Sequence, residues 1–266
     1  MPIISYALLL SRLNLQHLII VKAFDRKLLA APVSLKDGDR VLESGAGTGT
    51  WMLQLSTQVP STIQIHGVDI AFRLFPAIYP TNMSFSIGSI TSLPESWTSS
   101  FTFVHQRLLM GALTMTMWKA AISEISRVLV PGGWVEFVEA QASFPHVGTQ
   151  STKLAMFLVD MMRDKQLLVD CQIYIPIMLQ EAGLVNIHSE RRGIPFGRSA
   201  GQDGIDGSTN FAGAFVGMKA PMLQNGGYGY VQSEEEFDQL IADAKDEWLA
   251  SDSNLPFYTI YAQKPL

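Results

Sequence analysis

A glycine-rich turn behind a short apolar run constrains the fold of this chain more than any other feature. The stretch VLESGAGTGTW occupies residues 41–51, where Gly45, Gly47 and Gly49 alternate with small residues. Glycine adopts positive φ without strain and lets a backbone approach another group closely. The stretch therefore predicts a strand over residues 39–47, a tight turn, and a helix over WMLQLSTQV, residues 51–59.

Further apolar and β-branched runs follow at regular intervals. They are QIHGVDI (64–70), MSFSIGS (83–89), FTFVHQ (101–106), GWVEFVEA (133–140), VNIHSERRGIPFG (185–197) and the closing FYTIYAQKP (257–265). The first runs alternate with helical segments, which predicts an α/β fold with a mostly parallel sheet covered by helices on both faces. Pairing of the last two runs would make the sheet mixed.

Apolar periodicity identifies the helices between these runs. One carries an apolar stripe at Trp118, Ala121, Ile122, Ile125, Val128 and Leu129, and we expect PGG at 131–133 to end it. Residues 152–170, 175–184 and 233–248 have helical patterns, the last with a capping box of Ser233 and Glu236. Glycines through 197–230 predict a loop.

The composition limits the classes of partner that this protein is expected to bind. A net charge of −5 over 266 residues leaves no broad basic face for nucleic acid, so a small-molecule substrate is expected. The single cysteine, Cys171, cannot form an internal disulfide, and no Cys/His cluster has metal-site spacing, which indicates a reducing, cytoplasmic setting without a metal. The apolar segment 6–24 is interrupted by polar residues from Arg12 to His17, so we expect an amphipathic helix and no membrane span.

The glycine turn indicates a nucleotide ligand, because Asp69 ends the next strand and can accept hydrogen bonds from ribose hydroxyls. A bare turn is the structural alternative. Dinucleotide sites have the spacing G-x-G-x-x-G, whereas the third glycine here, Gly49, comes one position early. Glu43, two residues before Gly45, suits an ammonium group better than a pyrophosphate. The pattern favours S-adenosylmethionine (SAM) over a dinucleotide.

Together these motifs resemble the class I SAM-dependent methyltransferases over most of the chain. The resemblance is carried by VLESGAGTG (41–49), GVDI (67–70), FSIGSITSLPESW (85–97), FTFVHQRLL (101–109) and EISRVLVPGGWVEFVE (124–139). The motifs HQRLL, PGGWVE, IPFG and YAQKP are most similar to those of fungal methyltransferases related to the secondary-metabolism regulator LaeA. The resemblance implies a Rossmann-like fold with a seven-stranded, mostly parallel sheet.

The resemblance also implies a role for each motif residue. Glu43 would hold the amino group of SAM, the glycine turn would run beneath its methionine and ribose, and Asp69 would bind the ribose hydroxyls. Two departures are evident, since Ser89 stands where many relatives have a carboxylate for the adenine and Glu43 replaces the commoner aspartate. The complete cofactor-binding set is Glu43, Gly45, Ala46, Gly47, Gly49, Asp69, Ile70, Ser89, Ile90, His105 and Gln106.

Methyl transfer needs few catalytic side chains, because an in-line displacement from an activated donor depends mainly on positioning. His105, at the end of the fourth strand, is the first candidate for a general base if the acceptor is a hydroxyl or thiol. It can instead line the methionine pocket without moving a proton. Glu139, at the end of the fifth strand, is the second candidate, with helix capping or pairing with Arg107 as alternatives.

We expect a single methyltransferase domain over 1–266. Its parts would be an N-terminal helical lid (1–35) bearing Gln16 and His17, a SAM-binding core (36–144), substrate-cover insertions (145–175 and 197–232), and a closing helix and strand (233–266). Met156, Phe157, Met161, Met162, Phe211, Phe215 and Met218 would make the cover apolar, so an apolar or aromatic acceptor is expected. The same residues could form core or a homodimer interface.

Three functions remain open at this point. The first is a small-molecule methyltransferase of fungal secondary metabolism. The second is a LaeA-like SAM-binding regulator without a small-molecule substrate. The third is a dinucleotide-dependent oxidoreductase, which binding of NAD(P) in preference to S-adenosylhomocysteine (SAH) would reveal.

Overall fold

The computed structural model describes residues 6–142 and 147–266. The chain forms two compact units. The sheet unit comprises Lys27–Glu139, Asp170–Arg191 and Tyr258–Leu266, and the helical unit comprises the N-terminal residues up to Arg26 together with Ala140–Val169 and Arg192–Phe257. The expectation of one domain over the whole chain stays a prediction.

The sheet has seven strands in the order β3-β2-β1-β4-β5-β7-β6. Their bounds are β1 (Arg40–Ser44), β2 (Gln64–Asp69), β3 (Met83–Ile87), β4 (Phe101–Arg107), β5 (Leu129–Ala140), β6 (Val185–Pro195) and β7 (Asn254–Gln263). The first five strands pair in parallel, as predicted. The carboxyl ends of β1, β2 and β4 therefore meet at one edge, where open α/β sheets bind ligands.

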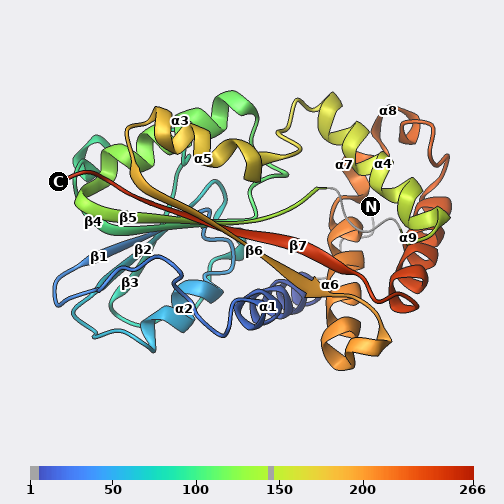
Figure 1. The fold of residues 1–266 in the computed structure, drawn as a ribbon, viewed down its shortest axis with the longest axis horizontal. Coiled ribbons are helices and arrows are strands. Elements are labelled where there is room, and N and C mark those ends of the chain that lie inside the picture. The colour runs from blue at the N-terminus through green and yellow to red at the C-terminus, as the bar shows by residue number, and fades with distance from the viewer. Residues whose placement is uncertain (1–5, 143–146) are drawn as a thin grey trace. The chain divides into compact units, whose positions relative to one another are not determined.

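Helices cover both faces of this sheet (Figure 1). Their bounds are α2 (Thr50–Ser56), α3 (Met115–Val128) and α5 (Cys171–Glu181), with short 3₁₀ turns at Phe72–Leu74 and Glu95–Trp97. Trp51 of α2 contacts Phe103 from one face, whereas Trp118 of α3 contacts Phe137 from the other. Residues in register on adjacent strands point to the same face, and successive residues along a strand point to alternate faces. By the register of β4 with β5, Phe103 and Phe137 therefore lie on opposite faces of the sheet, and so do α2 and α3.

The last strand makes the sheet mixed, as predicted. The backbone N–H of Gly132, near the start of β5, donates to the carbonyl of Lys264 beyond the end of β7, and Gln141 N–H, after β5, donates to Pro256 near the start of β7. This pattern of bonds is antiparallel.

The prediction that PGG at 131–133 ends the helix was wrong. The helix ends at Val128, and β5 already begins at Leu129, so Pro131, Gly132 and Gly133 lie inside the strand. The register of β5 with β4 shifts between Phe101 and Phe103, and Gly132 has φ of +79°. The glycines thus serve an irregularity of the strand rather than the end of the helix.

The other α-helices of the described residues belong to the helical unit. They are α1 (Tyr6–Ala23), α4 (Thr149–Asp164), α6 (Gln202–Gly217), α7 (Lys219–Met222), α8 (Gln224–Gly227) and α9 (Glu234–Leu249), with a 3₁₀ turn at Arg198–Ala200. Helix α6 packs on α1 and α9, and α4 packs on α9. The hydroxyl of Ser233 accepts the N–H of Glu236, which confirms Ser233 as the cap of α9. The Glu236 carboxylate, which the predicted capping box would direct to the Ser233 N–H, accepts the N–H of Gln232.

The prediction of a loop over 197–230 was also wrong, because α6 occupies much of it. Two glycines explain the error. A Cβ on Gly204 would lie 1.9 Å from the carbonyl oxygen of Gly197, and one on Gly207 would lie 2.2 Å from that of Pro195. These glycines are therefore needed for close packing of a helix, not for a turn.

The residues predicted to make an apolar cover are largely core of the helical unit. Phe157, Met161, Met162 and Phe215 are each at most 3% exposed, and the Phe157 ring stacks on Tyr230. Phe211 and Met218 are half-buried, and Met156 is 53% exposed. The N-terminal helix is present as predicted, with His17 buried and Gln16 half-buried.

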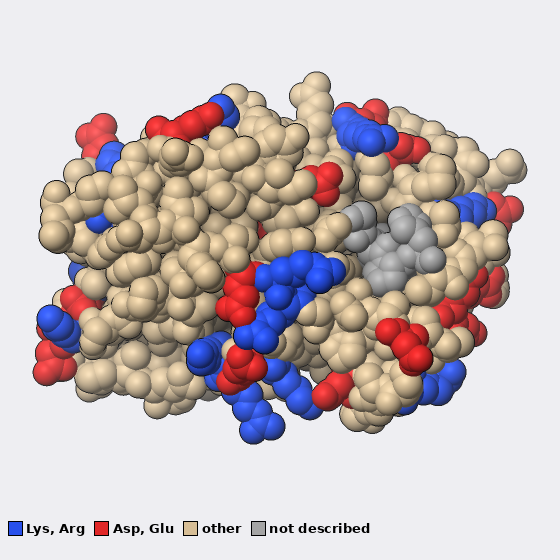
Figure 2. Space-filling view, in the orientation of Figure 1, with Lys and Arg blue, Asp and Glu red and all other residues tan. Residues whose placement is uncertain are grey.

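Acidic and basic side chains lie interspersed on the face drawn in Figure 2, in keeping with the net charge of −5. Across residues 6–142 and 147–266, no helix is long and apolar enough to span a bilayer. The same residues contain no group of three or more His, Cys, Asp or Glu side chains suited to a metal ion.

Candidate functional site

The glycine turn lies at the carboxyl edge of the sheet, between β1 and α2. Gly45, Gly47 and Gly49 have φ of +79°, +52° and +66°. The N–H groups of Gly45 and Ala46 both donate to the carbonyl of Val68, which ties the turn to the end of β2. A Cβ built on Gly47 would meet no atom within 4 Å. The turn therefore leaves open space beside Gly47, where a ligand can approach the backbone.

Asp69 lies against this turn. Its Oδ2 accepts the N–H of Gly47 at 2.8 Å, and its Oδ1 accepts the N–H of Ala71 at 3.2 Å. Each carboxylate oxygen can accept a second hydrogen bond, so these contacts orient the side chain while leaving acceptor capacity for hydroxyl groups. Asp69 is half-buried, so part of its side chain is accessible to a ligand.

Glu43 and His105 are brought together by the pairing of β1 with β4, which places them in register. Oε2 of Glu43 lies 2.6 Å from Nδ1 of His105. The imidazole ring stacks on Trp51 of α2, with centroids 4.1 Å apart and parallel planes. Glu43 is 2% exposed and His105 1% exposed, so this hydrogen bond lies in a region of low dielectric.

The two residues after His105 point to opposite faces. Gln106 accepts the hydroxyl of Ser44 at 3.0 Å on the face covered by α3, and its Nε2 has no hydrogen-bond partner among the described residues. Arg107 lies on the same face as Glu43 and His105. Burial lowers the pKa of its guanidinium, and attraction by Glu43 acts in the opposite direction.

Glu136 of β5 belongs to the same group, although it is not among the residues predicted for the site. It is in register with His105, and its Oε2 accepts the N–H groups of Ala30 and Ala31 at 2.7 and 2.8 Å. Burial raises its pKa, whereas the nearby imidazole and the two N–H groups act in the opposite direction. A carboxylate inside the otherwise apolar run WVEFV, residues 134–138, was the available signal.

Glu139, the second catalytic candidate, is fully buried on the opposite face of β5 from Glu136. Its two oxygens accept the N–H groups of Leu109 and Met110 at 2.9 and 3.2 Å. Burial raises the pKa of this carboxyl to about 8. Through these hydrogen bonds Glu139 holds the loop after β4 in place.

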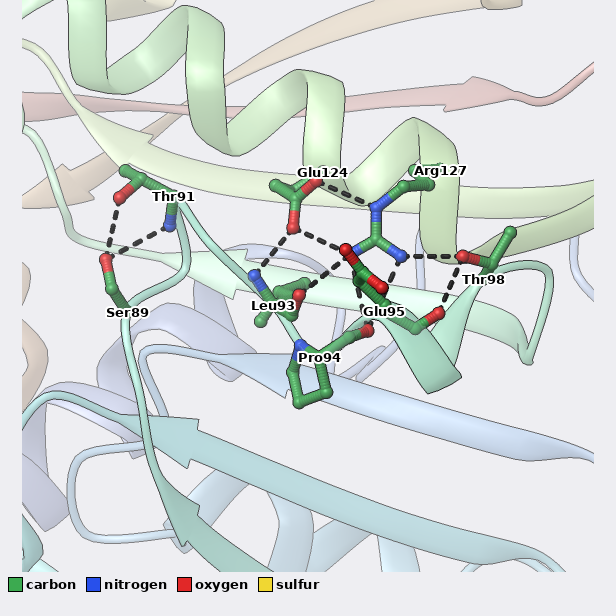
Figure 3. A network of polar contacts seen from close by, with 8 residues as sticks. All are labelled: Ser89, Thr91, Leu93, Pro94, Glu95, Thr98, Glu124 and Arg127. Carbon is green, nitrogen blue, oxygen red and sulfur yellow. Dashed lines mark hydrogen bonds and ion pairs between the residues drawn. The ribbon is translucent and has the colours of Figure 1, made fainter.

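Ser89 lies in the loop that follows β3 (Figure 3), and Ile90 comes directly after it in the chain. The hydroxyl of Ser89 lies 2.7 Å from that of Thr91 and accepts the Thr91 N–H. Ile90 is buried, whereas Ile70, after β2, is 79% exposed. Ile70 is thus accessible for contact with a ligand, while Ser89 already has a local partner.

An ion pair fastens the far end of this loop to α3 (Figure 3). Glu124 binds Arg127 through both carboxylate oxygens, at 2.8 and 2.7 Å, and also accepts the N–H of Leu93. Arg127 in turn donates to the carbonyls of Leu93 and Pro94. The hydrogen bond to Arg127 lowers the pKa of Glu124, so the pair stays charged. The loop bearing Ser89 is therefore anchored on the sheet unit.

Known proteins match this chain in sequence. Residues 15–189 match the model of the methyltransferase domain family. The N-methyltransferase tcpN of Claviceps purpurea is 29% identical over 95% of this chain and 93% of its own length. The N-methyltransferase gliN of Aspergillus fumigatus is 28% identical over 96% and 93%. The secondary metabolism regulator laeA of Gibberella zeae is 30% identical, over 49% of this chain and 41% of its own.

Solved structures share the fold. The Haemonchus contortus phosphoethanolamine N-methyltransferase 2 in complex with SAM has a TM-score of 0.54 at 18% identity, covering 94% of this chain and 52% of its own. The [4+2]-cyclase SpnF has a TM-score of 0.55 at 20% identity, covering 94% and 80%. The open glycine turn, with carboxylates at Glu43 and Asp69, fits such a cofactor. The chain therefore belongs to the methyltransferase domain family and is a SAM-dependent methyltransferase with a Rossmann-like class I fold.

Proposed function

We propose that this methyltransferase transfers a methyl group to a nitrogen atom of a small molecule in fungal secondary metabolism. One observation carries the proposal. The two fungal N-methyltransferases align over at least 93% of both chains, whereas the laeA regulator aligns over 49% of this chain. An apolar or aromatic acceptor is part of the proposal.

The cofactor would bind along the carboxyl edge of β1, β2 and β4. We assign its amino group to Glu43, its ribose hydroxyls to Asp69, and its adenine to the neighbourhood of Ile70 and Ile90. The hydrogen bond from Gly47 to Asp69 supports the ribose assignment, because it places the carboxylate next to the open space of the turn. The glycine turn from Gly45 to Gly49 would run beneath the ligand.

When bound, SAM supplies an activated methyl group, and the protein's task is to align the acceptor with it. A neutral nitrogen has a lone pair available, so it makes smaller demands on a protein base than a hydroxyl does. This suits the contacts of both candidate bases. His105 is buried against Trp51 and bonded to Glu43, and Glu139 accepts two backbone N–H groups. We therefore assign neither residue to proton transfer: His105 orients Glu43, and Glu139 holds the loop after β4.

The test is incubation of the protein with SAM carrying a ¹³C-labelled methyl group and extracts of fungal cultures. Labelled products are found by mass spectrometry, and the ¹³C chemical shift identifies the atom that carries the methyl group. The proposal expects an N-methyl signal that is lost with Gly47→Val. A labelled product methylated on oxygen, sulfur or carbon would contradict the acceptor assignment. SAM binding without any labelled product would favour the regulator.

A further inference from the structure

Three buried ionisable side chains lie in one row across the sheet unit. Glu43 of β1 is in register with His105 of β4, which is in register with Glu136 of β5. Register-paired side chains point to the same face, and neighbouring strands are about 4.8 Å apart, so the three lie side by side. Each is at most 2% exposed. Buried ionisable groups are rare unless their neighbours compensate them.

The imidazole in the middle of the row is held by two of its neighbours. Nδ1 lies 2.6 Å from Oε2 of Glu43, and the ring stacks on Trp51. Glu136 on the other side interacts electrostatically with His105. A carboxylate beside an imidazole commonly fixes the orientation of the ring and which nitrogen carries a proton. Arg107 also interacts electrostatically with this group, through Glu43.

Glu136 and Trp51 also hold one backbone segment. The carboxylate of Glu136 accepts the N–H groups of Ala30 and Ala31, and the indole Nε1 of Trp51 donates to the carbonyl of Leu28 at 3.2 Å. A purely structural explanation of Glu136 is therefore available, in which it only fastens residues 28–31. An experiment has to separate this explanation from an effect on Glu43.

We propose that Glu136 is a positioning residue for the cofactor: together with Trp51 it fixes His105, and His105 holds the Glu43 carboxylate in the orientation that receives the cofactor's amino group. The proposal rests on the assignment of Glu43 in the proposed function. One oxygen of Glu43 is committed to His105, so the direction of the other is set by the same hydrogen bond. The effect of Glu136 should therefore be confined to the amino-acid end of the ligand.

The test compares two ligands by calorimetry, SAH and 5′-methylthioadenosine, which shares the adenosine and sulfur but lacks the amino-acid part. Glu43→Gln should lower the preference for SAH by about tenfold, because a charge-assisted hydrogen bond is lost. Glu136→Gln keeps an oxygen for Ala30 and Ala31 but removes the ionisable carboxyl group. We expect it to lower the preference for SAH by about fivefold, the size of one ordinary hydrogen bond. Loss of affinity for both ligands alike would overturn the proposal.

Glu139→Gln is the matched control. Glu139 lies on the same strand, is equally buried and also accepts two backbone N–H groups, but it points to the opposite face from His105. Glu139→Gln should leave the ratio of the affinities for SAH and 5′-methylthioadenosine unchanged. If it lowers the ratio as much as Glu136→Gln does, the effect is not specific to the row, and the proposal fails.

His105→Phe keeps the proposal testable if Glu136→Gln does not fold. Phenylalanine can still stack on Trp51 but cannot donate to Glu43, so the preference for SAH should fall. An unchanged ratio in this variant, with a lowered ratio in Glu43→Gln, would overturn the positioning role and leave the proposed function standing. An unchanged ratio in Glu43→Gln would instead remove the amino-group assignment on which the proposal rests.

Discussion

His105 Nδ1 lies 2.6 Å from Glu43 Oε2, and neither side chain is more than 2% exposed. Both residues were candidates for the cofactor site, at positions 62 residues apart in the sequence. The hydrogen bond means that the imidazole already has a partner on one ring nitrogen, and the parallel stack on Trp51 restricts its rotation. Such a histidine is better suited to orienting Glu43 than to taking a proton from an acceptor.

His105→Ala tests this distinction. We expect the affinity for SAH to fall by about tenfold, since a hydrogen bond to a charged group contributes about 1.5–3 kcal/mol. The turnover number at saturating SAM should change much less, and its pH profile should keep its form. Calorimetry and a labelled-methyl assay on the acceptor measure the two quantities. A loss of kcat of roughly 10²-fold with unaltered SAH affinity would instead identify His105 as a general base.

Replacing Asp69 should weaken binding of the cofactor. Ribose hydroxyls donate charge-assisted hydrogen bonds of about 1.5–3 kcal/mol to a carboxylate, so Asp69→Ala should lower SAH affinity by about tenfold or more. The variant also loses the contacts with Gly47 and Ala71. Asp69→Asn, which keeps one acceptor oxygen, separates the loss of charge from loosening of the turn. Asp37→Ala is the control, because Asp37 binds Thr62 at the opposite end of β1; equal losses in Asp37→Ala and Asp69→Ala would refute the assignment.

Gly47→Val should abolish cofactor binding. Gly47 has φ of +52° and open space where a Cβ would lie, so valine would strain the turn and fill that space. Gly38→Val is a matched control, since Gly38 has φ of +85° and equally open surroundings but precedes β1. Both variants should lose stability in urea unfolding, but SAH binding should disappear only in Gly47→Val. Tight SAH binding by Gly47→Val would show that the turn has no ligand.

Gly67 should tolerate no side chain. It is in register with Glu43, and a Cβ there would lie 2.7 Å from Met52 Sδ, 2.8 Å from Phe85 and 2.9 Å from Ala46. Gly67→Ala should therefore reduce the free energy of unfolding by about 1–3 kcal/mol, the usual cost of overpacking. Gly111→Ala, where nothing lies within 4 Å, should change it by no more than about 0.5 kcal/mol. Urea unfolding measures both, and equal effects would contradict the packing argument.

The sequence predicted the strands well, because the central strands are buried on both faces and therefore apolar throughout. Its predictions were wrong where a glycine can serve either a turn or close packing. Gly204 and Gly207 looked like loop residues, but they allow α6 to lie against backbone carbonyls from distant residues. Gly132 looked like a helix stop, but it lies inside β5. Such close contacts depend on tertiary neighbours, which local propensity does not contain.

The site shows the same limit. Motif spacing identified Glu43, Asp69 and His105 individually, but the bond between Glu43 and His105 depends on the pairing of β1 with β4. Glu136 was missed because its face of β5 becomes evident only once the register with His105 is known. A motif thus identifies residues at the end of one strand, whereas a row across several strands requires the sheet order.

The buried carboxyl of Glu139 should give the protein a specific pH dependence. Burial raises its pKa to about 8 from an ordinary value of 4.5. Between these pH values the folded protein holds a proton that the unfolded chain has released. The free energy of unfolding therefore falls as pH rises through this window, by at most about 1.4 kcal/mol per pH unit from this group.

Glu139→Gln removes that contribution, so the stability of the variant relative to wild type should improve steadily from pH 5 to pH 8 and level off above. Urea unfolding at pH 5, 6, 7, 8 and 9 measures the difference. Glu247→Gln is the control: Glu247 likewise accepts two backbone N–H groups, from Gln150 and Ser151. Burial acts to raise the pKa of Glu247, but its hydrogen bonds outweigh burial and the pKa is lowered. Its stabilising effect is therefore present throughout this range and lost only at lower pH, so its difference from wild type should stay constant. A constant difference for Glu139→Gln as well would mean that Glu139 stays ionised in the folded protein, with its two N–H donors outweighing burial.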